Sequence, residues 1–311
     1  MQPTHTDECF NPNICYLPSL VPEDDLAAAN RALQGSRTVA EVAGPGLAGV
    51  LVGALGAPVA IAVDALSYIA STLGIARSRP MGQPASATRT TGAGPRPPVS
   101  QGLRILFTNT YLRALTIHAA LYNLAEQIFT LNLVLWAVQS QGLSPSSYGL
   151  AMGAAGIGGL VGTATALKVE RLLGLGRAFA ISLLLSCGAP LLAVAGNLHG
   201  AALAAVLAGI MFLSGLGLGH ANVYSLTMRQ TAIPKDQLTR SAGAYTQVMY
   251  GSIPLGSAIA GILGQHYGTR AATLAGALGM LCSMLPMLTR TVLNLRQAQD
   301  LHATTGNPAG K

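Results

Sequence analysis

Long apolar segments alternate with shorter polar ones along most of this 311-residue chain. Most of the apolar segments reach the roughly 20 residues that a helix needs to cross a bilayer. Helices are expected there because backbone groups within lipid must find hydrogen-bond partners inside their own segment. The pattern therefore predicts an all-α polytopic membrane protein. The expected spans cover residues 33–55, 58–76, 112–138, 148–167, 178–195, 201–228, 242–263 and 271–288.

One long polar interruption, residues 77–100, separates the first two expected spans from the other six. It is rich in Pro, Gly, Ser and Thr and carries four arginines. This composition predicts a flexible cytoplasmic linker. Residues 101–109 follow, with several apolar side chains beside Arg104. We expect a short interfacial helix there, leading into the third span.

Composition and charge support residence in a membrane. Half of the residues are apolar and 9% are charged, against about 25% charged in soluble domains. The net charge of +7 could mark a nucleic-acid binder. The positions of the basic residues distinguish this possibility from a membrane protein. Of the 18 Lys and Arg residues, Arg270 alone falls in the loops that the expected spans place outside. The positive-inside rule then predicts a multi-pass membrane protein with both termini cytoplasmic and no role in binding nucleic acid.

A stretch near the N-terminus, residues 20–56, recurs 212 positions later without a gap (234 − 22 = 212). One long period in a very apolar chain indicates two similar halves in a membrane. The second copy covers the last two of six spans, so the first copy should end an equivalent block. That block would begin about 110 residues before Met1, and we expect four helices of the first half to be missing. The matched pairs include Pro22 with Pro234, Gly44 with Gly256, Gly49 with Gly261 and Gly56 with Gly268.

Four stretches resemble the major facilitator superfamily, in the bacterial exporter branch that includes the enterobactin exporter and the transmembrane secretion effectors. They are YLPSLVPEDDLAAANRALQGSRTVAEVAGPGLAG (16–49), GAPVAIAVDALSYIAS (56–71), GLSPSSYGLAMGAAGIGGLVG (142–162) and SLTMRQTAIPKDQL (225–238). The resemblance implies two six-helix bundles that flank a central cavity and rock to expose it to either side in turn. The spans here would be helices five to twelve of such a transporter, and the resemblance implies a place in the bacterial inner membrane.

The resemblance also implies a division of the chain into parts of a partial transporter fold. We expect two helices of the N-terminal bundle and a complete six-helix C-terminal bundle. The expected parts are a polar leader unlike the family (1–15), the last two helices of the N-terminal bundle (16–76), a cytoplasmic linker with an interfacial helix (77–110), the C-terminal bundle (111–290) and a cytoplasmic tail (291–311).

A Gly-Pro motif in the first expected span is similar to the antiporter signature of proton-driven exporters. It consists of Gly44, Pro45, Gly46 and Gly49. Proline removes one helical hydrogen bond and kinks the helix, while small residues let a neighbouring helix approach closely. The same residues are also compatible with a packing kink that has no role in antiport.

Three acids fall inside expected spans, namely Glu41, Asp64 and Glu126. A charge in hydrocarbon costs a few kcal/mol or more, so each is a candidate for proton coupling or substrate binding. Alternatives remain for each acid. Glu41 could pair with Arg37 one turn away, Asp64 could pack against a polar helix end, and Glu126 could make an ordinary polar contact.

Further polar residues are candidates for the cavity lining, although a lone histidine in a span is often a hydrogen-bonded structural residue. These candidates are His118, Asn123, Gln127, Asn132, His220 and Asn222. A basic loop between two spans loosely matches the cytoplasmic loop motif of the resembling family, with an insertion, and the alternative is an ordinary positive-inside loop. Its residues are Lys168, Glu170, Arg171, Gly176 and Arg177.

Glycines at 156–159 and 215–217 lack the lysine, strand and acidic partner of a nucleotide site, which indicates helix packing. The sequence contains no recognisable metal cluster, ATP site or nucleophile with its base, so we expect no enzyme and no cofactor. The sequence also shows no charged rings or filter-like loops, which are the features expected of a channel.

The sequence and the resemblance together predict a secondary active transporter that exports a drug, siderophore or hydrophobic metabolite in exchange for protons. Its expected partners are the lipid bilayer, a small-molecule substrate, protons and, if encoded separately, the four missing helices. The alternative is a non-transporting membrane fragment, as a pseudogene product or an interaction subunit.

Overall fold

The structure is a computed structural model that describes residues 44, 47–48, 51–77, 99–194, 198–233 and 237–289. Every element assigned within these residues is helical. The main helices are α3 (Ala57–Arg77), α4 (Val99–Thr108), α5 (Thr110–Val134), α6 (Pro145–Leu173), α7 (Leu175–Gly188), α8 (Gly200–Ala232), α9 (Leu238–Tyr267) and α10 (Thr269–Ser283). Short π or 3₁₀ segments extend three of them, namely η2 (Leu135–Ser140), η3 (Ala189–Val194) and η5 (Leu285–Met287).

The helices confirm the predicted all-α membrane fold. Helices overlap all the expected spans from residue 58 onward, whereas the first expected span lies mostly outside the described residues. Five described segments are long and apolar enough to cross a membrane by length and composition. They are Ala57–Gly74, Pro145–Leu173, Leu175–Val194, Gly200–Ala232 and Thr269–Met287. The remaining long helices, α5 and α9, have 25 and 30 residues and pack against each other.

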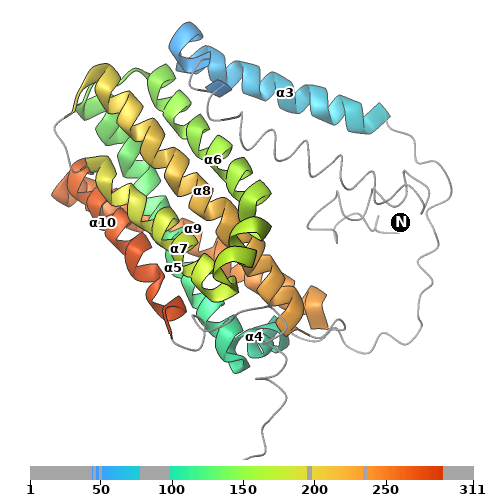
Figure 1. Cartoon of the computed structure of the whole chain (residues 1–311). Coiled ribbons are helices and arrows are strands. Elements are labelled where there is room, and N and C mark those ends of the chain that lie inside the picture. The colour runs from blue at the N-terminus through green and yellow to red at the C-terminus, as the bar shows by residue number, and fades with distance from the viewer. Residues whose placement is uncertain are drawn as a thin grey trace, which may run out of the picture.

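Helices α4 to α10 form a bundle, and α3 stands to one side of it (Figure 1). Within the bundle α6 packs mainly on α8, α5 packs on α9 and α10, and α7 packs on α8. The helix predicted at 101–109 is present as α4, which packs across the start of α5 and of α9, while its place at the membrane interface stays a prediction. On α4, Leu106 is fully buried while Phe107 is 42% exposed, so this helix covers one end of the bundle.

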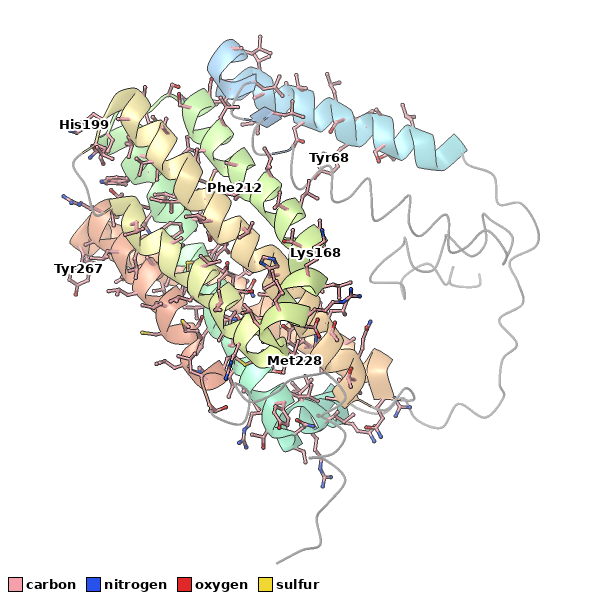
Figure 2. All side chains as sticks on the ribbon, viewed as in Figure 1. Tyr68, Lys168, His199, Phe212, Met228 and Tyr267 are labelled. Atoms are coloured by element: carbon pink, nitrogen blue, oxygen red, sulfur yellow. The ribbon has the colours of Figure 1, made fainter. Side chains whose placement is uncertain are left out.

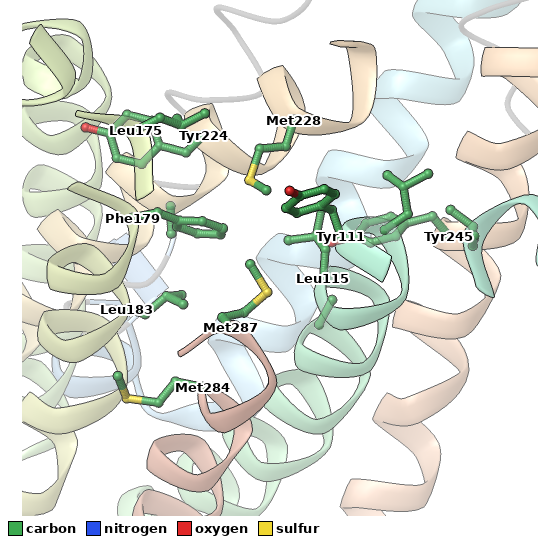
Figure 3. Packing of buried hydrophobic residues seen from close by; sticks show 14 of the residues in the cluster. Tyr111, Leu115, Leu175, Phe179, Leu183, Tyr224, Met228, Tyr245, Met284 and Met287 are labelled. Atoms are coloured by element: carbon green, nitrogen blue, oxygen red, sulfur yellow. The ribbon is translucent and has the colours of Figure 1, made fainter. Parts of the chain in front are cut away.

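Buried apolar side chains gather in two clusters along the bundle. One lies near α4 and contains Phe179, Tyr224 and Tyr245, which come from three different helices (Figure 3). The other lies toward the opposite end of α5 and includes Trp136 and Leu207. The side chains of α3 are exposed along almost its whole length. The bundle is therefore a packed body in which α3 takes no part in the described core.

Helices α6 and α8 meet backbone to backbone at glycines. A β-carbon added to Gly158 would meet the carbonyl oxygen of Phe212, and one added to Gly215 would meet that of Ala155. Close contacts of the same kind surround Gly162 and Gly219, whereas Gly217 of α8 meets the backbone of α7 at Ser182 and Ser186. The sequence-based interpretation of the glycines at 158, 215 and 217 as packing residues is confirmed. Small residues serve this purpose because no hydrophobic effect drives one helix onto another in lipid.

A glycine with positive φ makes a one-residue turn at three helix junctions. Gly56 has a φ of 80° and Gly268 a φ of 82°. The Gly56 amide donates to the Val52 carbonyl at 3.0 Å, and the Gly268 amide donates to the Gly264 carbonyl at 3.1 Å. These residues are 212 positions apart, so the two copies of the repeat share their turn. Gly174, between α6 and α7, has a φ of 80° in a similar turn.

Substitution of Gly215 by alanine should destabilise the bundle, because the added methyl group meets the backbone of α6. Overpacking of this kind typically costs about 1–3 kcal/mol. Gly209→Ala on the same helix is the matched control, since a β-carbon there meets nothing within 4 Å. We expect thermal unfolding of the purified protein in detergent to begin at a lower temperature for G215A alone. Equal unfolding temperatures for G215A and G209A would show that the crossing tolerates a methyl group.

Candidate functional site

Glu126 lies in the middle of α5, in a row of polar side chains spaced four residues apart. The row contains His118, Tyr122, Glu126 and Thr130. Residues four apart share one face of a helix, so the row faces the interior of the bundle together. The Thr130 hydroxyl donates a hydrogen bond to the Glu126 carboxylate at 3.3 Å. Within the described residues, no basic side chain forms an ion pair with that carboxylate.

A cavity of about 680 Å³ opens beside Glu126. Its walls come mainly from α5, α6 and α8. Most of the lining is apolar or aromatic, including Phe129, Tyr148, Met152 and Met211. The polar groups are few, among them Thr163, Ser214 and Asn222. Its size and mainly apolar lining match the usual range of small-molecule sites, about 300–1,000 Å³.

A second cavity of about 300 Å³ lies between α5, α7, α8 and α9. Its lining is more polar, with Asn123, Ser186, Ser225 and the two tyrosines Tyr245 and Tyr250. We call these two spaces the apolar cavity and the polar cavity. They share four lining residues, Tyr122, Glu126, Leu218 and Asn222. The Glu126 carboxyl therefore stands in a shared wall, between an apolar space and a polar one.

His118 and Tyr122 extend this polar row along the polar cavity. Nδ1 of His118 is 2.8 Å from the carbonyl oxygen of Ser283, which can only accept, so Nδ1 carries the proton of that bond. In the described residues no hydrogen bond involves the other ring nitrogen of His118. The Tyr122 hydroxyl is 3.4 Å from the hydroxyl of Ser186, and the His118 and Tyr122 rings lie 5.9 Å apart. The row thus extends from Glu126 to His118, which contacts the C-terminal end of α10 at Ser283.

His220 has a structural position between α6 and α8. Its Nε2 lies 2.9 Å from the Thr165 hydroxyl, and its ring stacks on Tyr224 at 6.2 Å. The Tyr224 hydroxyl in turn donates to the carbonyl of Ala166 at 2.7 Å. His220 is absent from the lining of both cavities. These contacts tie the glycine crossing together at one end.

Two other candidates of α5 face α9 instead of the cavities. Asn132 is 2% exposed and donates from its amide to the Ala260 carbonyl at 3.2 Å. A β-carbon added to Gly264 would press on the Asn132 side chain, and one added to Gly256 would meet that of Gln127. The structure therefore brings Glu126, Asn123, His118 and Asn222 together around the cavities. It places Gln127 and Asn132 at the α5–α9 interface.

The other sequence candidates lie away from the two cavities. Asp64 is exposed on α3, and its backbone carbonyl accepts a hydrogen bond from Ser67. Gly44 is helical, whereas Glu41, Pro45, Gly46 and Gly49 lie outside the described residues. The basic loop motif flanks the turn at Gly174. Lys168, Glu170 and Arg171 end α6, with Lys168 visible there in Figure 2, and Gly176 and Arg177 begin α7. The roles of all these residues stay predictions.

Some lining residues were missed in the sequence. Tyr122 and Thr130 belong to the four-residue spacing that passes through Glu126, so the helix period could have found them. Tyr148, Thr163 and Ser214 come from α6 and α8, and only the crossing of these helices brings them to the cavity. No group of three or more His, Cys, Asp or Glu side chains that could hold a metal occurs in the described part of the chain.

Comparison with protein families matches residues 14–309 to the transmembrane secretion effectors. The match covers most of the chain, so the protein belongs to this family of major facilitator transporters. It is a multi-pass membrane protein of the transporter class. Comparisons with curated proteins and with solved structures gave no match.

A cysteine at position 222 should be reached by water, because Asn222 lines both cavities. Thiols react as thiolates, which form in water and not in lipid. Leu226→Cys is the matched control, one turn further along α8, since Leu226 is 48% exposed but lines neither cavity. In a background without the four native cysteines, we expect a charged methanethiosulfonate to label N222C several-fold faster than L226C. Equal labelling rates would contradict the cavity assignment.

Proposed function

We propose that this protein exports a small hydrophobic molecule in exchange for protons, with Glu126 as the carboxyl group that carries the proton. The observation that supports this proposal is the place of Glu126 in the wall between the apolar and polar cavities. A proton carrier has to meet both the substrate and a route to water. On this proposal the apolar cavity holds the substrate, and the polar cavity is the path by which protons reach the carboxyl group.

The energetics of a buried carboxylate favour this role. An acid at the centre of a membrane costs about 2.5–3.5 kcal/mol or more when charged and without a partner. The Glu126 carboxylate has the Thr130 hydroxyl as its hydrogen-bond donor and no ion-pair partner among the described residues. Loss or gain of a proton therefore changes the stability of each substrate-bound state strongly. That change is what a proton-coupled carrier needs to link the two fluxes.

The proposed direction of transport is export, and the predicted topology orients the proposed cycle in the membrane. The basic residues gather in the loops that the spans place on one side, which the positive-inside rule makes the cytoplasm. In the proposed cycle Glu126 takes a proton from the outer side, and the carrier releases that proton inward as it resets. The substrate leaves the cytoplasm in the same cycle. We propose that the Gly44 to Gly49 motif supports the same cycle by kinking its helix. The basic loop at 168–177 is proposed to hold the cytoplasmic side closed through charge contacts.

Glu126 is preferred over the other two acids for reasons of position. Asp64 is exposed on α3 and lines neither cavity, while Glu41 lies outside the described residues. The protonation of an acid that couples proton movement to transport has to depend on whether substrate occupies the binding cavity. Among the described acids, Glu126 lines both cavities, whereas Asp64 and Glu170 line neither.

Replacement of Glu126 by glutamine should abolish gradient-driven transport, because glutamine keeps the shape but cannot exchange a proton. Inverted vesicles from cells that express the chain are energised by respiration, and accumulation of Nile red is followed with and without a protonophore. We expect protonophore-sensitive accumulation in the wild type and a loss of about tenfold or more in E126Q.

Asp64→Asn is the control, as an acid-to-amide change away from both cavities, and should retain accumulation close to the wild-type value. If the protonophore does not change accumulation in the wild type, the proposed coupling of transport to the proton gradient is wrong. If protonophore-sensitive accumulation persists in E126Q, a group other than Glu126 carries the proton.

A further inference from the structure

We propose that His118 is a proton-binding site, and that a proton on its Nε2 atom opens the polar cavity to water. The proposed function assigns no role to this histidine, so the inference goes beyond it. The support comes from the hydrogen bonds of one ring nitrogen, the burial of the ring and the distance to the nearest acid. In this role His118 makes the access of water to the polar cavity depend on pH.

The Nδ1 atom of His118 is fixed as a hydrogen-bond donor. It lies 2.8 Å from the Ser283 carbonyl oxygen and 3.3 Å from the Ser283 hydroxyl oxygen. The carbonyl can only accept, and the hydroxyl donates its own proton to the Met280 carbonyl at 2.6 Å. Nδ1 therefore carries the hydrogen of the neutral ring, and Nε2 holds the lone pair.

The end of α10 explains why the Ser283 carbonyl accepts from a side chain. In a continued α-helix this carbonyl would accept from the amide of Met287. The Met287 amide donates instead to the Met284 carbonyl at 2.9 Å, in the η5 turn that contains Pro286. His118 replaces the missing backbone donor and ties α5 to α10. This bond is compatible with protonation, since both ring nitrogens of a histidine cation are donors.

The Nε2 atom of His118 is the one that can take up a proton. The described residues that line the polar cavity come from α5, α7, α8 and α9, and none of them comes from α10. Because the Nδ1 edge of the ring is turned to α10, the edge that carries Nε2 is left to line the cavity. Water has a way in, since Asn222 and Tyr250 line the same cavity and are exposed.

A proton on His118 is incompatible with a closed, dry cavity. The residue is 7% exposed, and a buried cation without a partner is strongly unfavourable. Glu126 is two turns further along α5, about 12 Å away along the helix axis, which is too far for an ion pair. The charge therefore has to be solvated by water in the polar cavity. Since the proton and the water favour the same state, each promotes the binding of the other.

The groups around His118 leave it and Glu126 as the two that change charge near neutral pH. Tyrosine and cysteine side chains are largely neutral there, and arginine keeps its charge. From α8 the cavity receives the uncharged Asn222 and Ser225, and Arg229 lies over the Tyr245 ring at 4.1 Å. The other titratable side chains near His118 are Tyr122 and Glu126 on α5, Cys187 on α7, Tyr245 and Tyr250 on α9, and Cys282 beside Ser283 on α10.

The wall that α9 contributes is able to move. Tyr245, Met249 and Tyr250 line the polar cavity from the first half of this helix. Pro254 follows inside the helix and has no amide that could donate to the Tyr250 carbonyl. A proline within a helix is a usual cause of bending. Water that enters with the proton can therefore be accommodated by a movement of the first half of α9.

Cysteine labelling at two pH values tests the inference on the full purified chain. In a background without the four native cysteines, S225C reports on the polar cavity. L172C is the reference, because Leu172 is 82% exposed at the end of α6. The readout is the labelling rate of S225C divided by that of L172C, at about pH 8 and about pH 5.5. This ratio removes the loss of thiolate that both positions share at low pH.

An anionic and a cationic methanethiosulfonate are both used. Water in the cavity speeds labelling by both reagents, whereas charge attraction alone speeds labelling by one of them. We expect the ratio to rise several-fold from the higher to the lower pH in the wild-type background with both reagents. A ratio that does not change with pH there, or that rises with one reagent alone, would overturn the inference.

His118→Asn tests whether the histidine is the group that responds. Asparagine keeps an amide that can donate to Ser283 but does not titrate, so the ratio should stay constant. His266→Asn is the matched control, since His266 is an exposed histidine of α9, and should respond like the wild type. An equal rise in H118N and in the wild type would contradict the role of His118. His118→Gln is a second variant without a titratable ring, should H118N fail to fold, and a constant ratio is expected for it too.

The inference and the proposed function are tested separately by E126Q. The pH response of the ratio should persist in E126Q, because Glu126 is not the group that opens the cavity. If the response is lost in E126Q and kept in H118N, it belongs to Glu126 and the inference is wrong. Loss of gradient-driven transport in E126Q does not bear on His118.

Discussion

The close crossing of α6 and α8 is the contact on which the rest of the bundle depends. Helices in lipid gain little from hiding apolar side chains from each other, so they associate through tight packing and interhelical hydrogen bonds. At Gly158 and Gly215 the two backbones approach closely enough to exclude a methyl group. The same crossing lines the apolar cavity, since Gly159, Gly215 and Gly219 belong to its wall. Stability and the candidate site therefore share one set of residues.

Helix α5 shows how a polar stripe is accommodated inside a membrane bundle. Its residues from His118 to Thr130 place polar groups every fourth position, while neighbours such as Phe129 and Leu133 are buried in the core. Helices α9 and α10 pack along α5. Helix α5 carries this stripe and is not among the described segments that qualify as spans by composition. Its place in the bundle comes from packing.

The sequence predicted most of the helices, because apolar segments of membrane-spanning length have few alternatives to helix in lipid. The repeat predicted more than composition could, since Gly56 and Gly268 adopt the same turn with the same hydrogen bond. Glu126 was found as a candidate because an acid in an apolar segment is conspicuous. His220 and Asn132 were predicted as cavity residues together with Glu126, yet their side chains contact α6 and α9.

What sequence reasoning could not supply is the direction in which each polar side chain faces. A helix has a definite period, but its rotation within the bundle depends on contacts such as the α6–α8 crossing, which involve residues about 55 positions apart in the chain, as for Thr165 and His220. Tyr148 and Ser214 are ordinary residues of their segments until that crossing brings them to one cavity. The shared wall of Tyr122, Glu126, Leu218 and Asn222 is likewise a property of two helices together.

The one-residue turns have a mechanical consequence for a protein that has to change shape. Only Gly174 separates α6 from α7, and only Gly268 separates α9 from α10. A connection of one residue leaves little freedom, so neither helix of such a pair can slide along its partner without breaking the backbone hydrogen bonds that close the turn. We therefore expect each pair to move as one unit. Longer connections, such as residues 141–144 between η2 and α6, place no such restraint on the helices that they join.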